Sequence, residues 1–332
     1  MKIRERTEEW EHKTLSSAAA FSDKTRGRER NEPEDDTRTA YQRDRDRILH
    51  CNSFRRLMHK TQVFISPEGD HFRTRLTHTL EVSQIARTIA RALCLNEDLT
   101  EAIAIGHDLG HTPFGHAGEA GLDEISPQGY RHFEQSVRVV EKLEHDGEGL
   151  NLTYVFSNCI LCHSHGAYAD TREGRIVRFA DKSAYMNHDI EDSVHAGIIT
   201  EDDLPFNVKC VLGRNKSERI STLVESIIKN SIDDIKMGDK EFAAYKELRE
   251  FMFEFVYKSK VVHDEEDKAT ELVKRLYEYF CEKTDKLPKE YRKIAEEDGN
   301  SRAICDYISG MSDRFAISLY EEFFIPRSWT KP

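Results

Sequence analysis

Apolar residues recur every three or four positions along most of this chain, a spacing that places them on one face of a helix. The pattern is clearest in residues 77–95, 99–109 (after a cap in 96–98), 133–143 and 176–194, with further helices predicted near 220–236, 239–258, 265–283 and 301–322. Strand signals are confined to residues 62–65. Eight prolines and 17 glycines leave few breakers in 332 residues. We therefore predict an all-α fold.

The breakers gather in four turns, expected at residues 67–69, 110–118, 126–129 and 147–149. Residues 1–40 are charged and lack apolar periodicity, which is typical of an extended or partly disordered arm. The composition shifts near 200–240, but no flexible linker is found there. We predict an arm over 1–40, a helical core over 41–200, and a C-terminal helical region over 201–332 packed on that core.

Charge and cysteine content limit the partners and the compartment. Lysine and arginine total 49 against 61 acidic residues, and this net charge of −12 disfavours broad binding to nucleic acid or anionic lipid. No apolar stretch approaches the roughly 18 residues of a membrane span. The first residues are charged, which argues against a secretory signal. Seven dispersed cysteines then indicate reduced thiols, so we expect a cytoplasmic protein without a membrane partner.

Two other motifs carry little weight. Nine arginines between Arg26 and Arg56 could form a nucleic-acid arm, but Glu and Asp interleave them, so single-stranded DNA is only an alternative partner. The segment Cys159-Ile160-Leu161-Cys162-His163 fits a haem-attachment pattern. Haem attachment of this kind follows export, and we expect no export signal in this chain.

Histidine is concentrated in the middle of the chain: thirteen of the 15 histidines fall between His50 and His195. His107 and Asp108 are adjacent at the end of an apolar helix, and Leu99 and Ile103 turn that face inward. An inward pair of this kind needs partners. Isolated, it would most often be a buried histidine satisfied by a carboxylate. A helix that ends beside glycine and proline could also hold a metal with open positions.

Residues in three other segments favour the interpretation as a metal site. His78 shares the core-facing stripe of its helix, with Arg73 and Arg75 just upstream. Asp181, Tyr185 and Asp189 follow one another at a spacing of four on another helix face, and His132 and Gln135 share a third. Histidine and carboxylate ligands together suit Mn²⁺, Fe²⁺ or Mg²⁺ better than a thiolate site would.

The order His78, His107-Asp108, Asp181 resembles the metal site of the HD-domain phosphohydrolases. Within them, the chain is similar to the bacterial deoxyguanosinetriphosphate triphosphohydrolase-like proteins, in the superfamily of the vertebrate dNTP triphosphohydrolases. The resemblance covers residues 5–325 and rests on seven motifs: TRTAYQRDRDRILH (37–50), FRRLMHKTQVF (54–64), RTRLTHTLEVSQIARTIARAL (73–93), HDLGHTPFGHAGE (107–119), HFEQSVRVV (132–140), ADKSAYMNHDIEDS (180–193) and DYISGMSDRFA (306–316).

The resemblance implies an HD-domain helical bundle that hydrolyses a deoxynucleoside triphosphate, dGTP or a broader set, at the α-phosphorus, releasing deoxynucleoside and inorganic triphosphate. It implies a divalent metal, Mn²⁺ or Mg²⁺ with Fe²⁺, Ni²⁺ or Zn²⁺ as alternatives. The implied ligands are His78, His107, Asp108 and Asp181. His116 and Glu119 fall at the catalytic dyad, where a carboxylate can orient the imidazole for proton transfer.

Substrate contacts are implied in the same way. His111, His132 and Arg75 match positions at the phosphates, Gln62 and Asp189 match contacts to the sugar 3′-hydroxyl, and Tyr185 matches the residue that excludes a 2′-hydroxyl. Lys182 departs from the acidic residue expected there and either touches phosphate or is exposed. Asp306 and Asp313 lie in a characteristic stretch with either a docking or a nucleotide-binding role. Relatives form homo-oligomers, often hexamers, and a dNTP activator is a further expectation. The alternatives are another HD-domain nucleotide phosphohydrolase and a dNTP-sensing or DNA-binding regulator with a vestigial site.

Overall fold

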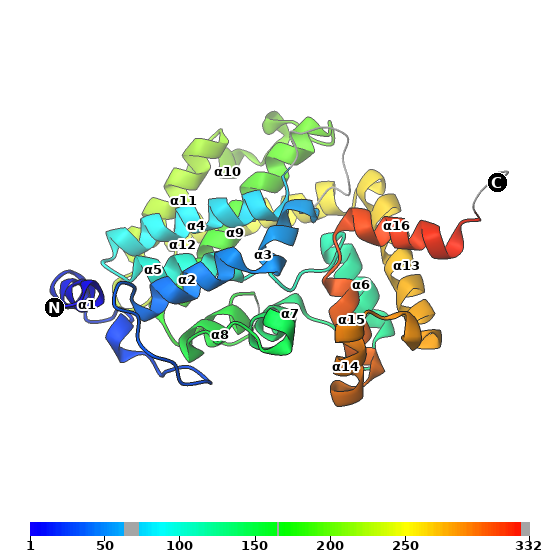
Figure 1. Ribbon diagram of the computed structural model, residues 1–332. Coiled ribbons are helices and arrows are strands. Elements are labelled where there is room, and N and C mark those ends of the chain that lie inside the picture. Colours follow the sequence, from blue (N-terminus) through cyan, green and yellow to red (C-terminus); the bar gives the residue numbers. More distant parts are fainter. Residues whose placement is uncertain (63–72, 165, 327–332) are drawn as a thin grey trace.

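The computed structural model describes residues 1–62, 73–164 and 166–326. Within these residues the chain forms sixteen α-helices and no β-strand, which confirms the all-α prediction (Figure 1). The helices are α1 (Ile3–Thr14), α2 (Ala40–His50), α3 (Asn52–Arg56), α4 (Arg75–Ala92), α5 (Glu97–Gly106), α6 (Gly115–Ile125), α7 (His132–Arg138), α8 (Tyr154–Leu161), α9 (Arg172–His195), α10 (Phe206–Val211), α11 (Lys216–Asn230), α12 (Asp239–Met252), α13 (Lys260–Glu282), α14 (Lys289–Asp298), α15 (Asn300–Ser309) and α16 (Asp313–Phe324). No helix in the described part of the chain is long and apolar enough to cross a membrane.

The helix α5 lies at the centre of the larger of two hydrophobic cores. Its residues from Ala102 to Gly106 are all buried, and Leu99, Ile103 and Ala104 are completely buried. It packs against α2, α4, α8 and α9. The expected cap is confirmed, because the Asn96 side chain accepts a hydrogen bond from the backbone N–H of Leu99. The end of α5 is therefore held firmly inside the protein.

A smaller core joins α6 to the C-terminal helices. Phe114, Leu122, Val273 and Ile308 are among its buried residues. The helix α6 packs against α13, which also packs against α15 and α16, and Figure 1 shows these helices grouped at one end of the molecule. Leu109 belongs to the larger core and Phe114 to the smaller one. The segment 107–115 therefore passes from one core to the other.

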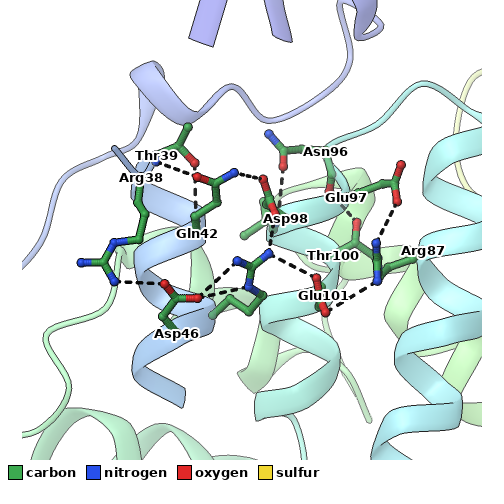
Figure 2. A network of polar contacts seen from close by, with 12 residues as sticks. Arg38, Thr39, Gln42, Asp46, Arg87, Asn96, Glu97, Asp98, Thr100 and Glu101 are labelled. Carbon is green, nitrogen blue, oxygen red and sulfur yellow. Dashed lines mark hydrogen bonds and ion pairs between the residues drawn. The ribbon is translucent and has the colours of Figure 1, made fainter. Parts of the chain in front are cut away.

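Charged side chains connect α2, α4 and α5 at the surface (Figure 2). Gln42 and Arg45 of α2 donate to Asp98 of α5 at 2.8 and 2.7 Å, while Arg87 of α4 pairs with Glu101 at 3.7 Å. Each such partly exposed pair contributes on the order of 0–1 kcal/mol. The network nevertheless pairs an α2 arginine with carboxylates, although a nucleic-acid arm would need such a charge free to bind phosphates.

Other arginines of the 26–56 segment are also engaged by carboxylates. Arg28, Arg43 and Arg47 all contact Glu32, at 2.9, 3.1 and 2.6 Å. The arginine charge of this segment is thus largely balanced within the chain.

The N-terminal residues differ from the expected extended arm, because residues 3–14 form α1. Arg4 pairs with Glu8 along this helix at 2.7 Å. Glu11 is buried and accepts hydrogen bonds from the backbone N–H and the hydroxyl of Ser22, at 2.8 and 2.6 Å. Polar contacts rather than apolar periodicity stabilise this helix, which explains why the sequence pattern did not indicate it.

Three further expectations need correction or lie beyond the structure. The turn expected at 110–118 ends at Phe114, because α6 begins at Gly115. The single helix expected over 301–322 is two helices, α15 and α16, separated at 310–312. Gln62 lies outside any helix, and the rest of the expected strand at 62–65, together with the turn at 67–69, falls outside the described residues. The segment 133–143 is helical as expected, with a π-helical turn from Val139 to Leu143.

Candidate active site

Four predicted ligand side chains meet where α5 ends. His78 lies on α4, Asp181 on α9, and His107 and Asp108 follow the last residue of α5. The Nε2 atom of His78 is 3.2 Å from Oδ1 of Asp181 and 3.9 Å from Oδ2 of Asp108. The Nε2 atom of His107 is 3.3 Å from Oδ1 of Asp108 and 3.8 Å from Oδ1 of Asp181. Two imidazoles and two carboxylates thus face one another.

The orientation of His107 fits a metal ligand. Its ring is completely buried, and Nδ1 lies 2.7 Å from the carbonyl oxygen of Ala104, so Nδ1 carries the proton. Nε2 then has a lone pair that accepts no hydrogen bond within the described chain. An unpaired buried acceptor is costly, and a divalent cation would satisfy it. The donor set suits Mn²⁺, Fe²⁺ or Mg²⁺.

His78 is oriented by a chain of side chains behind it. Its Nδ1 lies 3.3 Å from Nδ1 of His188, and Nε2 of His188 contacts the carboxylate of Glu81. Burial lowers the pKa of His188 to about 4, so its ring is neutral near pH 7. With its proton on Nε2, beside Glu81, the neutral ring of His188 accepts at Nδ1 from Nδ1–H of His78, which leaves the lone pair of His78 Nε2 facing Asp181.

The two aspartates of the cluster are ionised. Burial opposes ionisation of Asp108, but His107, His111 and Arg75 together hold its pKa well below the usual range. Arg75 donates to Oδ2 of Asp108 at 2.9 Å. For Asp181, burial is again outweighed, and the neighbouring imidazoles of His78 and His107 lower its pKa to about 2. Both carboxylates are therefore available as anionic ligands.

Glu119 lies between two histidines of a second cluster. Its Oε2 is 2.9 Å from Nδ1 of His132 and 3.6 Å from Nδ1 of His116, and its Oε1 accepts the backbone N–H of His132 at 3.0 Å. Despite its burial, the hydrogen bonds with both histidines hold the pKa of Glu119 well below its usual range. The His116 side chain is 75% exposed. The predicted dyad is present as a contact, and Glu119 contacts His132 more closely.

His111 connects the two clusters. Its ring stacks on that of His132, with ring centroids 4.0 Å apart and an interplanar angle of 14°. Its Nε2 lies 3.3 Å from Oδ1 of Asp108. Burial and the neighbouring charge of Arg75 hold the pKa of His111 well below its usual range. Asp108, His111 and His132 also lie close enough together to form a second group able to hold a metal ion.

His163 belongs to this site and was missed from the sequence. It is buried, its ring centroid lies 5.0 Å from that of His107 and 5.4 Å from that of His132, and Nδ1 is 2.6 Å from the carbonyl oxygen of Ile160. Burial and the nearby His107 lower its pKa to about 3. The motif Cys159–His163, set aside as a haem-attachment pattern, contained the only sequence signal for this residue.

Two predicted substrate residues lie farther along α9, each beside a tyrosine from the following helices. The hydroxyl of Tyr185 is 3.3 Å from that of Tyr245 on α12. The hydroxyl of Tyr257, in the π-helical turn Phe253–Tyr257, donates to Oδ2 of Asp189. Burial raises the pKa of Asp189 to about 7. Neither Tyr245 nor Tyr257 was expected, because tertiary contacts of α12 and of the turn after it bring these two hydroxyls to α9.

Gln62 and Arg75 meet beside the first residue of α6. A Cβ on Gly115 would lie 3.0 Å from Nη2 of Arg75 and 3.1 Å from the carbonyl oxygen of Gln62. The side-chain oxygen of Gln62 and the Nε atom of Arg75 are both buried, and neither has a hydrogen-bond partner among the described residues. Lys182, next to Asp181, is partly buried, and burial lowers its pKa.

Known proteins resemble this chain in sequence and fold. An HD domain model matches residues 75–186, and a phosphohydrolase-associated domain model matches residues 235–322. A deoxyguanosinetriphosphate triphosphohydrolase-like protein of Caldanaerobacter subterraneus is 54% identical over 331 residues, covering 99% of this chain and 98% of that protein. A protein of the same name from Clostridium perfringens is 49% identical over 338 residues, covering 98% and 99%.

A solved structure, that of a hypothetical protein from Aquifex aeolicus, matches with a TM-score of 0.50 and 19% identity, over 86% of this chain and 68% of that one, and supports the fold alone. The sequence matches extend over nearly the whole chain and include the described cluster of histidines and aspartates. The chain belongs to the family of deoxyguanosinetriphosphate triphosphohydrolase-like proteins and is a metal-dependent HD-domain phosphohydrolase.

Proposed function

We propose that the protein is a dNTP triphosphohydrolase, which cleaves dGTP or several dNTPs at the α-phosphorus into deoxynucleoside and inorganic triphosphate. The observation that carries the proposal is the buried Nε2 of His107, which has no hydrogen-bond partner among the described residues and lies in a cluster of two imidazoles and two carboxylates. A divalent ion held by His78, His107, Asp108 and Asp181 would polarise a phosphate oxygen and lower the pKa of water. We propose Mn²⁺ or Mg²⁺, with Fe²⁺, Ni²⁺ or Zn²⁺ as alternatives.

The second cluster supplies proton transfer and phosphate contacts in this proposal. The exposed imidazole of His116 would take part in proton transfer, with Glu119 as the anion beside it. His111, His132 and Arg75 bind the phosphates. Their proximity to Asp108 supports this role, because a substrate phosphate near the metal would lie within reach of all three.

The proposed sugar contacts rest on two buried acceptor atoms. The Oε1 atom of Gln62 and the Oδ1 atom of Asp189 are both buried and have no hydrogen bond to the part of the chain that the structure describes. The 3′-hydroxyl of a deoxyribose would donate to such acceptors and remove this cost. Tyr185 would pack under the sugar ring, where a 2′-hydroxyl would clash with it.

We further propose the division of the chain into an arm (1–40), a metal-dependent core (41–200) and a C-terminal helical region (201–332). A homo-oligomer such as a hexamer, a dNTP activator and a cytoplasmic location complete the proposal, and they rest on the family resemblance.

The test is turnover of the four dNTPs, alone and in pairs, with Mn²⁺ and with Mg²⁺, followed by chromatography of the products. We expect triphosphate, lost in Asp108→Asn and retained in the matched control Asp44→Asn, whose carboxylate is equally buried but contacts Thr153 and Arg28. Activity only in mixtures would establish an activator. Diphosphate or orthophosphate would instead indicate another HD-domain phosphohydrolase. Tight dNTP binding by metal-free protein without turnover would indicate a regulator.

A further inference from the structure

The segment that joins the two site clusters contains an unfavourable turn. Phe114 has φ 62° and ψ 21°, and Gly115 follows with φ 57°. Two successive left-handed residues are uncommon, and for phenylalanine the conformation is disfavoured by its Cβ. His111 precedes this turn and His116 follows it. The positions of both histidines therefore depend on whatever holds the turn in place.

Asp313, the first residue of α16, holds the turn from the C-terminal region. Asp313 is 4% exposed, and its Oδ1 accepts a hydrogen bond from the backbone N–H of Phe114 at 2.9 Å. Its Oδ2 accepts the backbone N–H of Thr61 at 2.8 Å and the hydroxyl of the same residue. Thr61 immediately precedes Gln62. One buried carboxylate thus connects the backbone beside Gln62 to the backbone just before His116.

Lys60 makes a second connection in the same place. Its ammonium group is buried and donates to the carbonyl oxygens of His111 at 2.5 Å and Ser309 at 2.8 Å. Ser309 is the last residue of α15. The two ends of the segment 111–114 are therefore both tied to the connection between α15 and α16. Gly115 also packs closely against Gln62 and Arg75, which leaves the turn little room to shift.

We propose that Asp313 and Lys60 form a clamp through which the C-terminal region positions Gln62, His111 and His116 for catalysis. The proposal rests on the proposed hydrolase function. Both clamp residues bind backbone groups of the site segments, so they act as positioning residues. The hydrogen bonds of the two clamp side chains go to Thr61, His111, Phe114 and Ser309, and not to the predicted ligands His78 and Asp181, so loss of the clamp should disturb catalysis more than metal binding.

The test compares Asp313→Asn with Asp44→Asn. Asp44 is a matched control, because it also accepts the backbone N–H and the hydroxyl of a threonine, Thr153, at 3.1 and 2.6 Å. Both variants should unfold at a lower temperature. Only Asp313→Asn should lower kcat, by about tenfold or more, since a displacement near 1 Å can cost on the order of 10²-fold. Its Mn²⁺ affinity should stay within about twofold of wild type.

Hydrogen exchange of residues 111–119, followed by mass spectrometry, separates the clamp from the proposed function. We expect faster exchange there in Asp313→Asn and not in Asp44→Asn, whether or not the wild-type protein hydrolyses dNTPs. Unchanged kcat and unchanged exchange in Asp313→Asn would overturn the clamp. If Asp313→Asn does not fold, Thr61→Val removes the hydroxyl that donates to Asp313. That variant should then show the same local increase in exchange, and its absence would equally overturn the clamp.

Discussion

Removal of the hydrogen bond behind His78 should weaken metal binding. The change is His188→Leu, which deletes the acceptor 3.3 Å from Nδ1 of His78. Substitution of groups that orient a ligand histidine typically costs 10–100-fold in metal affinity. The nitrogen-to-nitrogen distance is longer than the ideal 2.7–3.2 Å range, so we expect the lower end, about tenfold. That factor corresponds to about 1.4 kcal/mol.

The assay is calorimetric titration of metal-free protein with Mn²⁺. His188→Asn is the matched control, because its side-chain oxygen can reach the position of Nδ1 and accept from His78. We expect the asparagine variant to bind more tightly than the leucine variant. Mn²⁺ affinity in His188→Leu within twofold of wild type would refute the argument that His188 orients the ring of His78.

Three further predictions concern pH, specificity and metal removal. Burial raises the pKa of Asp189 from 3.8 to about 7, so the folded state binds this proton more tightly than the unfolded chain, and stability should fall as pH rises from about 4 to about 7. Between these pH values the free energy of unfolding, measured with urea, should fall by on the order of 1–4 kcal/mol more in wild type than in Asp189→Asn. The same pH dependence in both proteins would contradict this prediction. Tyr185→Ala should raise turnover of GTP relative to dGTP by about tenfold, measured as a ratio of kcat/KM values, and an unchanged ratio would exclude the steric role. Removal of the metal by a chelator should abolish turnover and lower the unfolding temperature, and excess Mn²⁺ should restore both. A ligand at 100 times its Kd stabilises the folded state by about 2.7 kcal/mol. Full activity after chelation would argue against a metal.

Sequence periodicity was sufficient to predict the helices that carry or directly precede the candidate ligands. Apolar stripes located α4, α5 and α9, because each buries a face against the larger core. The helix α6 was missed because its glycines resemble breakers. A Cβ on Gly118 would lie 2.1 Å from the carbonyl oxygen of Pro113, and one on Gly121 would lie 3.0 Å from that of Thr270 on α13. These glycines permit close packing, which local sequence cannot distinguish from a turn.

The candidate site was predictable where its residues lie in one motif or on one helix face. His163, His188, Tyr245 and Tyr257 escaped prediction because their roles depend on which helices pack together. Asp313 was assigned to either docking or nucleotide binding, and its contacts are with backbone groups of Thr61 and Phe114. A side chain that binds another segment's backbone has no partner that a sequence motif could identify.

The most direct test of the proposed reaction is the hydrolysis of dGTP in ¹⁸O-labelled water with Mn²⁺, with both products analysed by mass spectrometry. Attack of water on the α-phosphorus predicts deoxyguanosine without label and inorganic triphosphate with one ¹⁸O atom. Release of diphosphate or orthophosphate, or label in the deoxyguanosine, would contradict the proposed cleavage.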